Sequence, residues 1–220
     1  MCSPMLHLLA LLFAASPDLS AACGGKDLVA CLKGALALEK SEPERAEALY
    51  VEGCRHHEAI CSELASFLLN RRAKPDPATA EKVAKASCEQ HQNAIACAMR
   101  GLALMDLDRH AEAAAANELG CKLGHQTACT NLATALIRGR GMKEDKARAR
   151  ELLQQGCAAY EKQTGAAGDA LKDPMVCQNL ALALQQGWGG PVDEPGAARA
   201  ATLACQRGRL KQACEWASRR

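Results

Sequence analysis

The sequence is poor in aromatic residues and carries almost no net charge. Phe, Trp and Tyr make up 3% of the 220 residues, and 27 basic against 25 acidic side chains give a formal net charge of +2. Proteins that bind nucleic acid combine a basic surface with aromatic side chains on which bases stack. Neither feature is present, so the sequence predicts no nucleic-acid partner. Apolar residues amount to 49% of the chain and are mostly alanine and leucine, a composition that favours helices.

A long apolar run of the kind that spans a membrane is also missing. The run from Met5 to Ala15 is too short for an ordinary transmembrane helix, and small residues follow it up to Ala22. This pattern resembles a secretory signal peptide, so residues 1–22 are predicted to be removed by cleavage after Ala22. A mitochondrial targeting segment is the alternative, although the stretch contains no arginine. We expect a secreted or periplasmic protein without stable membrane insertion, with the mitochondrial intermembrane space as the alternative location.

The sequence has 13 cysteines but no C-x-x-C motif. Zinc ribbons, thioredoxin-like redox sites and covalent haem attachment need such closely spaced cysteines, so none of them is supported. Loss of Cys2 with the leader leaves twelve cysteines, and lipidation of Cys23 would leave an odd number for pairing. The twelve fall into six successive local pairs, namely Cys23 with Cys31, Cys54 with Cys61, Cys88 with Cys97, Cys121 with Cys129, Cys157 with Cys177, and Cys205 with Cys214.

The spacing of Cys121 and Cys129 predicts a helical hairpin. On one unbroken helix the two residues would be separated by about 12 Å of axial rise, whereas a disulfide needs Cα atoms roughly 4.4 to 6.8 Å apart. If the first helix ends at Gly124, which accepts a left-handed conformation, and a second begins at His125, the chain folds back and the cysteines can meet. We therefore expect a hairpin that a disulfide staples near its turn.

The side chains around the cysteines repeat. The second cysteines of successive pairs lie 30, 36, 32, 48 and 37 residues apart, the range of helical-hairpin repeats. Four residues after the second cysteine the side chain is always small, at Ala35, Ala65, Gly101, Ala133 and Ala181. Seven residues after it stands a leucine, at Leu38, Leu68, Leu104, Leu136 and Leu184. Eight residues before the first cysteine of the next pair stands an alanine, at Ala46, Ala80, Ala113, Ala149 and Ala197. These columns mark the faces on which neighbouring helices approach closely.

Two alternating motifs carry a family resemblance. ACTNLATAL, from Ala128 to Leu136, is followed by G-x-G-x-x-x-D-x-x-x-A-x-x-L-L-x-x-G-C from Gly139 to Cys157, and this alternation resembles the Sel-one-like repeat family. The resemblance implies an all-α fold of αα-hairpins stacked as a solenoid in a right-handed superhelix. The cysteine spacing is similar to that of the cysteine-rich Hcp subgroup, which implies one disulfide in each repeat. We expect residues 23–220 to form a single solenoid domain of about five repeats plus a C-terminal capping helix.

Catalytic motifs are missing as well. A serine β-lactamase needs Ser-x-x-Lys, and no serine here has a lysine at that offset. The H-E-x-x-H pattern of zinc hydrolases is also absent, so we predict no catalytic residue, no cofactor and no metal site. His56, His57, His91 and His125 fall at predicted turns, where we interpret them as solvent-exposed turn and cap residues rather than metal ligands.

The predicted function is that of an interaction scaffold. Asn131 and Asn179 both stand two residues after a second cysteine, on the helix that lines the concave face in related superhelical repeats. An asparagine there can hold a peptide backbone or a terminal carboxylate, so these two are candidate ligand contacts for a protein or peptide partner. The resemblance leaves two alternatives, a β-lactam-binding protein or weak β-lactamase, and an assembly factor of the mitochondrial intermembrane space.

Overall fold

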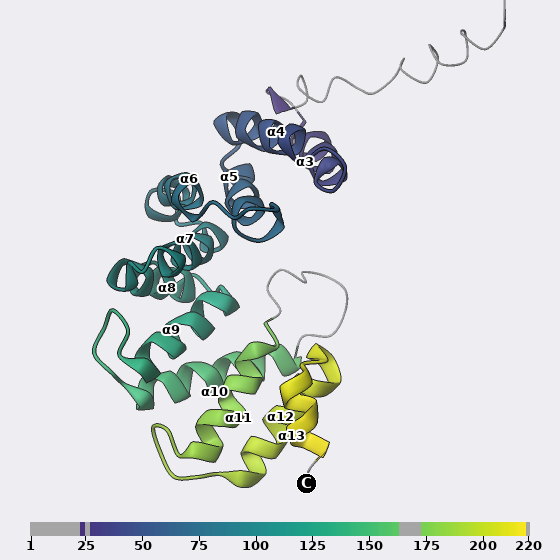
Figure 1. Cartoon of the computed structure of the whole chain (residues 1–220). Coiled ribbons are helices and arrows are strands. Elements are labelled where there is room, and N and C mark those ends of the chain that lie inside the picture. The colour runs from purple at the N-terminus through teal and green to yellow at the C-terminus, as the bar shows by residue number, and fades with distance from the viewer. Residues whose placement is uncertain (1–22, 25–26, 163–172, 219–220) are drawn as a thin grey trace, which may run out of the picture. The chain divides into compact units, whose positions relative to one another are not determined.

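The computed structural model describes residues 23–24, 27–162 and 173–218, and in this part of the chain the regular structure is helical (Figure 1). The predicted leader, residues 1–22, lies outside the described residues. The helices are α3 (Leu28–Leu38), α4 (Pro43–His56), α5 (Glu58–Ser66), a short π-helix η1 (Phe67–Arg71), α6 (Pro77–Glu89), α7 (Ala94–Asp106), α8 (His110–Lys122), α9 (Gln126–Arg138), α10 (Lys146–Lys162), α11 (Met175–Gln186), α12 (Glu194–Gly208) and α13 (Lys211–Ser218). The expected all-α fold is confirmed.

The disulfides join consecutive helices near their shared turns. We call α3, α5, α7, α9, α11 and α13 the first helices of the repeats, and α4, α6, α8, α10 and α12 the second helices. From Cys54 onwards, each bridge connects a second helix to the first helix that follows it. The bonded pairs are Cys23–Cys31, Cys54–Cys61, Cys88–Cys97, Cys121–Cys129, Cys157–Cys177 and Cys205–Cys214. The fold is therefore a series of αα-hairpins stapled by disulfides, as expected.

The turn between α8 and α9 has the conformation that its sequence predicts. Gly124 adopts φ +88°, and the Cα atoms of Cys121 and Cys129 lie 4.5 Å apart. His125 is the N-cap of α9, where its Nδ1 accepts a hydrogen bond from the backbone N–H of Ala128. Asn93 caps α7 at the equivalent position by accepting from the Ala96 N–H. The turn residue and the cap together direct the chain back on itself within a few residues.

The small side chains of the repeat form the contacts between helices. The alanines that stand eight residues before a first cysteine are all buried, as are the small residues four positions after a second cysteine. A Cβ atom on Gly120 would lie 2.9 Å from the Cβ of Ala128, closer than real atoms pack. The helices approach closely because these positions have almost no side chain, and leucines such as Leu104, Leu132 and Leu153 fill the remaining space.

The chain divides into two compact units, with the boundary between Pro75 and Asp76. The first unit has an aromatic core in which the rings of Tyr50 and Phe67 lie 5.5 Å apart. The Arg71 guanidinium lies over the Tyr50 ring, and the Tyr50 hydroxyl donates a hydrogen bond to Glu39. Burial, together with that hydrogen bond, raises the pKa of Tyr50, so the phenol stays neutral. The second unit contains α6 to α13. Whether residues 23–220 form a single domain stays a prediction.

Removal of one staple should lower stability measurably. The Cys121–Cys129 bridge closes a loop with a sequence separation of 8 residues, for which the chain-entropy model gives roughly 2 to 3 kcal/mol. We expect the double variant Cys121→Ala, Cys129→Ala to lose about that much free energy of unfolding, measured by guanidinium denaturation of the oxidised protein. Full reduction of the wild-type protein should lower the midpoint much further. An unchanged midpoint after reduction would show that helix packing alone stabilises the fold.

Candidate functional site

A polar pocket lies where α7, α8 and α9 meet, in the second unit. It encloses a volume of about 70 Å³. Its lining residues are Met105 of α7, His110, Ala113, Ala114 and Asn117 of α8, Asn131, Thr134, Ala135 and Arg138 of α9, and Arg140 of the loop that follows α9. We refer to this group as the polar pocket. It contains Asn131, one of the two asparagines that the sequence identified as a candidate ligand contact.

The loop after α9 completes the polar pocket because it packs tightly on the start of α8. Gly141 has φ +71°, and a Cβ atom on it would overlap the backbone carbonyl of His110. Only glycine allows this approach without strain. The G-x-G motif thus places Arg140, which lies between the two glycines, at the edge of the pocket. The loop of the next repeat uses Gly189 in the same way against the Lys146 carbonyl.

Asn117 is a buried polar side chain without a hydrogen-bond partner for its Oδ1 among the described residues. It is 1% exposed. It stands four residues before the first cysteine of its pair, and the equivalent residues in the other repeats are Tyr50, Ala84, Leu153 and Ala201. Burying an unpaired polar atom lowers the free energy of unfolding by about 1 to 3 kcal/mol. No other repeat has a carboxamide at this position, so the asparagine needs an explanation.

Gly101 provides the space for the Asn117 side chain. A Cβ atom on Gly101 would overlap the Asn117 carboxamide. Four residues after the second cysteine, the other four repeats have alanine where this one has Gly101. The only glycine at that position therefore faces Asn117, the only asparagine among the residues four positions before a first cysteine. The two residues form a matched pair that admits a carboxamide at the base of the pocket. Asn117 is not among the ligand contacts predicted from the sequence, although both exceptions are visible there.

Asn131 contributes a second unpaired amide to the polar pocket. Its Nδ2 is buried and has no hydrogen-bond partner in the described part of the chain. Asn117 and Asn131 thus both line the polar pocket, and each has one buried carboxamide atom without a partner among the described residues. Asn179 occupies the same repeat position on α11 and is half-buried, but there Leu153 takes the place of Asn117. The structure thus gives the two predicted asparagines different surroundings, and their role as ligand contacts stays a prediction.

The rim of the polar pocket is cationic. Arg138 and Arg140 are exposed, and neither forms an ion pair with another described residue. His110 lies beside them, with its Nε2 3.8 Å from a carboxylate oxygen of Asp108. The lining of the pocket therefore combines two carboxamide side chains with two guanidinium groups that form no ion pair with another described residue. This arrangement fits a polar ligand with a negative charge.

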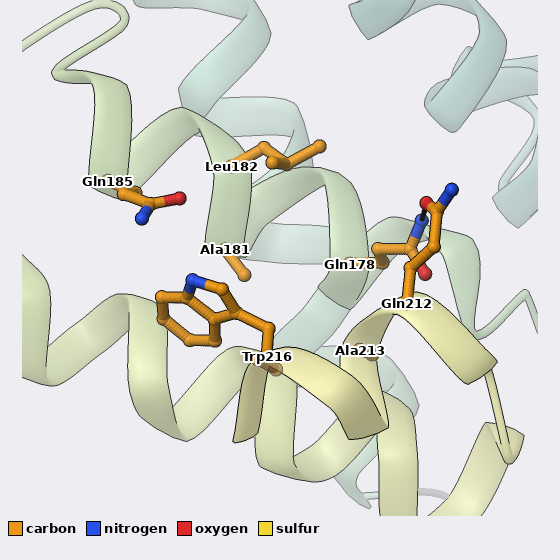
Figure 2. A pocket seen from close by; sticks show the side chains of 8 residues that line it. Gln178, Ala181, Leu182, Gln185, Gln212, Ala213 and Trp216 are labelled. Atoms are coloured by element: carbon orange, nitrogen blue, oxygen red, sulfur yellow. Dashed lines mark hydrogen bonds between the residues drawn. The ribbon is translucent and has the colours of Figure 1, made fainter. Parts of the chain in front are cut away.

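A second pocket, which we call the apolar pocket, lies where α11, α12 and α13 meet. Its volume is about 100 Å³. Figure 2 shows the Trp216 indole beneath Ala181 and Gln185, with Leu182 on the far side and the Gln178–Gln212 pair at one end. The Nε2 of Gln178 donates a hydrogen bond to Oε1 of Gln212 at 3.0 Å. The helix that we expected to cap the last repeat thus takes part in building a cavity.

Two larger hollows are lined mainly by second helices. One, of about 270 Å³, lies along α10 and α12, and the other, of about 350 Å³, lies along α8 and α10. Neither lining contains a serine, the nucleophile that the β-lactamase alternative would require. Within residues 23–24, 27–162 and 173–218, no three His, Cys, Asp or Glu side chains are grouped closely enough to hold a metal ion. None of the helices in those ranges combines the length and the apolar character needed to cross a membrane.

The prediction that the turn histidines are all solvent-exposed is wrong for His125, and in part for His57, which is half-buried with its Nε2 closed to solvent. The His125 side chain is only 3% exposed, and the Asp173 carboxylate, two residues before α11, lies close enough to act on its charge. Burial lowers the pKa of His125, and the nearby Asp173 carboxylate offsets this effect only in part. By contrast, His91 is exposed, and His56 lies at the surface 3.2 Å from a carboxylate oxygen of Glu52. The sequence could identify the turn position but not the element that covers it.

Comparison with solved structures shows a Sel1 repeat fold. The protective antigen c5321 of uropathogenic Escherichia coli, which displays this fold, aligns with a TM-score of 0.75 and 19% identity. The alignment covers 90% of this chain, which spans only 42% of the length of c5321. A Sel1 repeat protein from Oxalobacter formigenes aligns with a TM-score of 0.70 and 18% identity over 96% of this chain and 80% of that protein. Searches against protein-family models and curated proteins gave no match. Membership of the Hcp subgroup stays a prediction.

The buried His125 should make stability depend on pH. Since its folded-state pKa lies below the value near 6.5 of an unperturbed histidine, its neutral form contributes to stability in full above that pH. The contribution is lost as the pH falls through the folded-state pKa, because folding then requires release of a proton. We expect His125→Asn, which keeps a capping side chain like Asn93, to flatten the fall in the free energy of unfolding between neutral and mildly acidic pH. His91→Asn should keep the wild-type profile, and equal profiles for all three proteins would contradict the assignment.

Proposed function

We propose that this protein is an exported scaffold that binds a peptide segment of a protein partner along the first helices of its second unit, α7, α9, α11 and α13. The polar pocket supports this role, because its lining combines side chains of the successive first helices α7 and α9 with those of the second helix α8 between them. The predicted ligand contact Asn131 belongs to it. Helical-hairpin repeats commonly present extended binding surfaces of this kind, since neighbouring repeats align equivalent side chains.

The unpaired carboxamides of Asn117 and Asn131 are the observation that carries the proposal. A polar atom buried without a partner is expensive, and a ligand that supplies the missing hydrogen bonds removes that cost. An extended peptide offers both an N–H donor and a C=O acceptor in each residue. The two unpaired carboxamide atoms are buried as the side chains lie, so binding requires both carboxamides to turn toward the pocket. One peptide unit can then donate to Asn117 and accept from Asn131, while a nearby acidic group pairs with Arg138 or Arg140.

The disulfides support export. Six bonded cysteine pairs in one chain are typical of an oxidising compartment rather than the cytosol. Together with the leader predicted at residues 1–22, they favour a secreted or periplasmic protein. The intermembrane-space and β-lactam alternatives remain compatible with the fold, but no side chain of the described residues favours either of them.

The proposal predicts peptide binding that depends on both asparagines. A phage-displayed library of random linear dodecapeptides would be selected on the oxidised protein, and the affinity of enriched peptides measured by fluorescence anisotropy. We expect Asn117→Ala and Asn131→Ala each to weaken binding about tenfold, the effect of losing one hydrogen bond worth about 1.4 kcal/mol. Gln206→Ala, an exposed carboxamide on the second helix α12, is the matched control and should bind like the wild type.

Asn117→Ala also separates binding from folding. Because alanine occupies the equivalent buried position at Ala84 and Ala201, the variant should keep or raise the free energy of unfolding while it loses peptide affinity. The absence of enriched peptides, or peptides that bind both asparagine variants as well as the wild type, would refute the proposed function.

A further inference from the structure

The apolar pocket is built at the same repeat position as the polar pocket. Trp216 stands two residues after the second cysteine of its pair, as Asn131 does, and Ala201 stands four residues before the first cysteine, as Asn117 does. Gln185 on α11 corresponds to Met105 on α7. Both cavities are therefore lined by two successive first helices of the second unit and the second helix between them, two repeats apart. The register of the repeat places them on the same face.

The linings of the two pockets differ in charge. The eight side chains around the apolar pocket are alanine, leucine, glutamine and tryptophan, and none is charged, whereas two arginines stand at the rim of the polar pocket. Leu182 on α11 lines this pocket and is 42% exposed, so a ligand in the pocket would cover part of its apolar surface. Occupation of the apolar pocket by a charged group would cost desolvation without compensation, so its occupant has to be uncharged.

The size and shape of the apolar pocket fit one side chain. A volume of about 100 Å³ holds an aliphatic or aromatic side chain but no folded element. The Trp216 ring and the Leu182 side chain provide apolar contact on opposite sides, as Figure 2 shows. The Gln178–Gln212 pair at the end of the pocket uses one donor and one acceptor in its own hydrogen bond and keeps the other carboxamide atoms for a ligand backbone.

We propose that the apolar pocket binds an aliphatic or aromatic side chain of an extended peptide whose acidic residue lies at the polar pocket. Packed helix axes are about 8 to 10 Å apart, so two repeats separate the pockets by about 20 Å. An extended chain covers about 3.3 to 3.6 Å per residue, so the apolar residue and the acidic residue are about six positions apart. This inference rests on the proposed function and specifies the partner as an extended segment with these two anchors.

Trp216 provides a direct measurement of the apolar pocket. In a Trp188→Phe background it is the only tryptophan of the chain. We expect N-acetyl-leucinamide to shift Trp216 emission to shorter wavelength in a saturable manner, and N-acetyl-serinamide to have no effect. Leu182→Glu, which places a charge at the edge of the pocket, should abolish the shift. Val192→Glu replaces another exposed aliphatic residue, 57% exposed and outside the pocket lining, and should preserve it.

The dodecapeptide selection tests the spacing. Peptides enriched on the wild type should carry an apolar residue about six positions from an acidic one, and replacing that apolar residue by serine should weaken binding about tenfold or more. Peptides enriched on Leu182→Glu should keep the acidic residue and lose the apolar one.

The outcomes separate the two proposals. Enriched peptides that depend on Asn131 but tolerate Leu182→Glu would overturn the apolar anchor and leave the proposed function standing. A leucinamide shift without any enriched peptide would refute the proposed function, and with it the two-anchor peptide. An emission of Trp216 that shifts with protein concentration, together with a doubled mass in sedimentation, would assign the pocket to a second copy of the chain instead.

Discussion

The disulfide between each second helix and the next first helix is the constraint on which the rest of the structure depends. It holds two Cα atoms 4.5 to 4.8 Å apart, closer than most helix contacts allow. The residues beside the bridge must then be small, which is why Gly120 and Gly156 precede first cysteines and alanines occupy the buried columns. Because the bridge fixes the register of each hairpin, residues at the same distance from a cysteine take equivalent places in successive repeats. The two pockets follow from that register, and their different chemistry follows from a few substitutions within it.

Much of the fold could be predicted from the sequence, because the cysteines act as fixed reference points. The hairpin turn at Gly124, the capping by Asn93 and the buried alanine columns all follow from local spacing, and the structure has each of them. Local rules suffice where the interaction lies within one turn of the chain or across one bridge. They fail where a neighbouring repeat decides the environment. His125 has the sequence context of an exposed cap, but its burial is set by residues beyond the next helix, among them Asp173.

The candidate site was only half predictable for the same reason. Asn131 could be proposed from its position on a first helix, whereas Asn117 lies on a second helix, where an asparagine suggests nothing by itself. Its significance depends on two facts about its neighbours, the missing side chain of Gly101 and the absence of a hydrogen-bond partner among the described residues. Likewise, the sequence identified the segment around Trp216 as a polar cap, because the cavity exists only once α11 and α12 are in place beside it. Both residues stand out only when the repeats are compared column by column, since Asn117 is the only carboxamide and Trp216 the only aromatic side chain of its column.

The order of the bridges along the chain has a consequence for biosynthesis. From Cys23 onwards the cysteines bond as successive neighbouring pairs, and five of the six bridges have a sequence separation of only seven to nine residues. If the chain is exported as proposed, both partners of one bridge emerge before either partner of the following bridge. An oxidase that joins cysteines in their order of appearance therefore produces the native connectivity directly, without rearrangement by an isomerase. The repeats can accordingly fold one after another from the N-terminus, each against a preceding repeat whose disulfide has already formed.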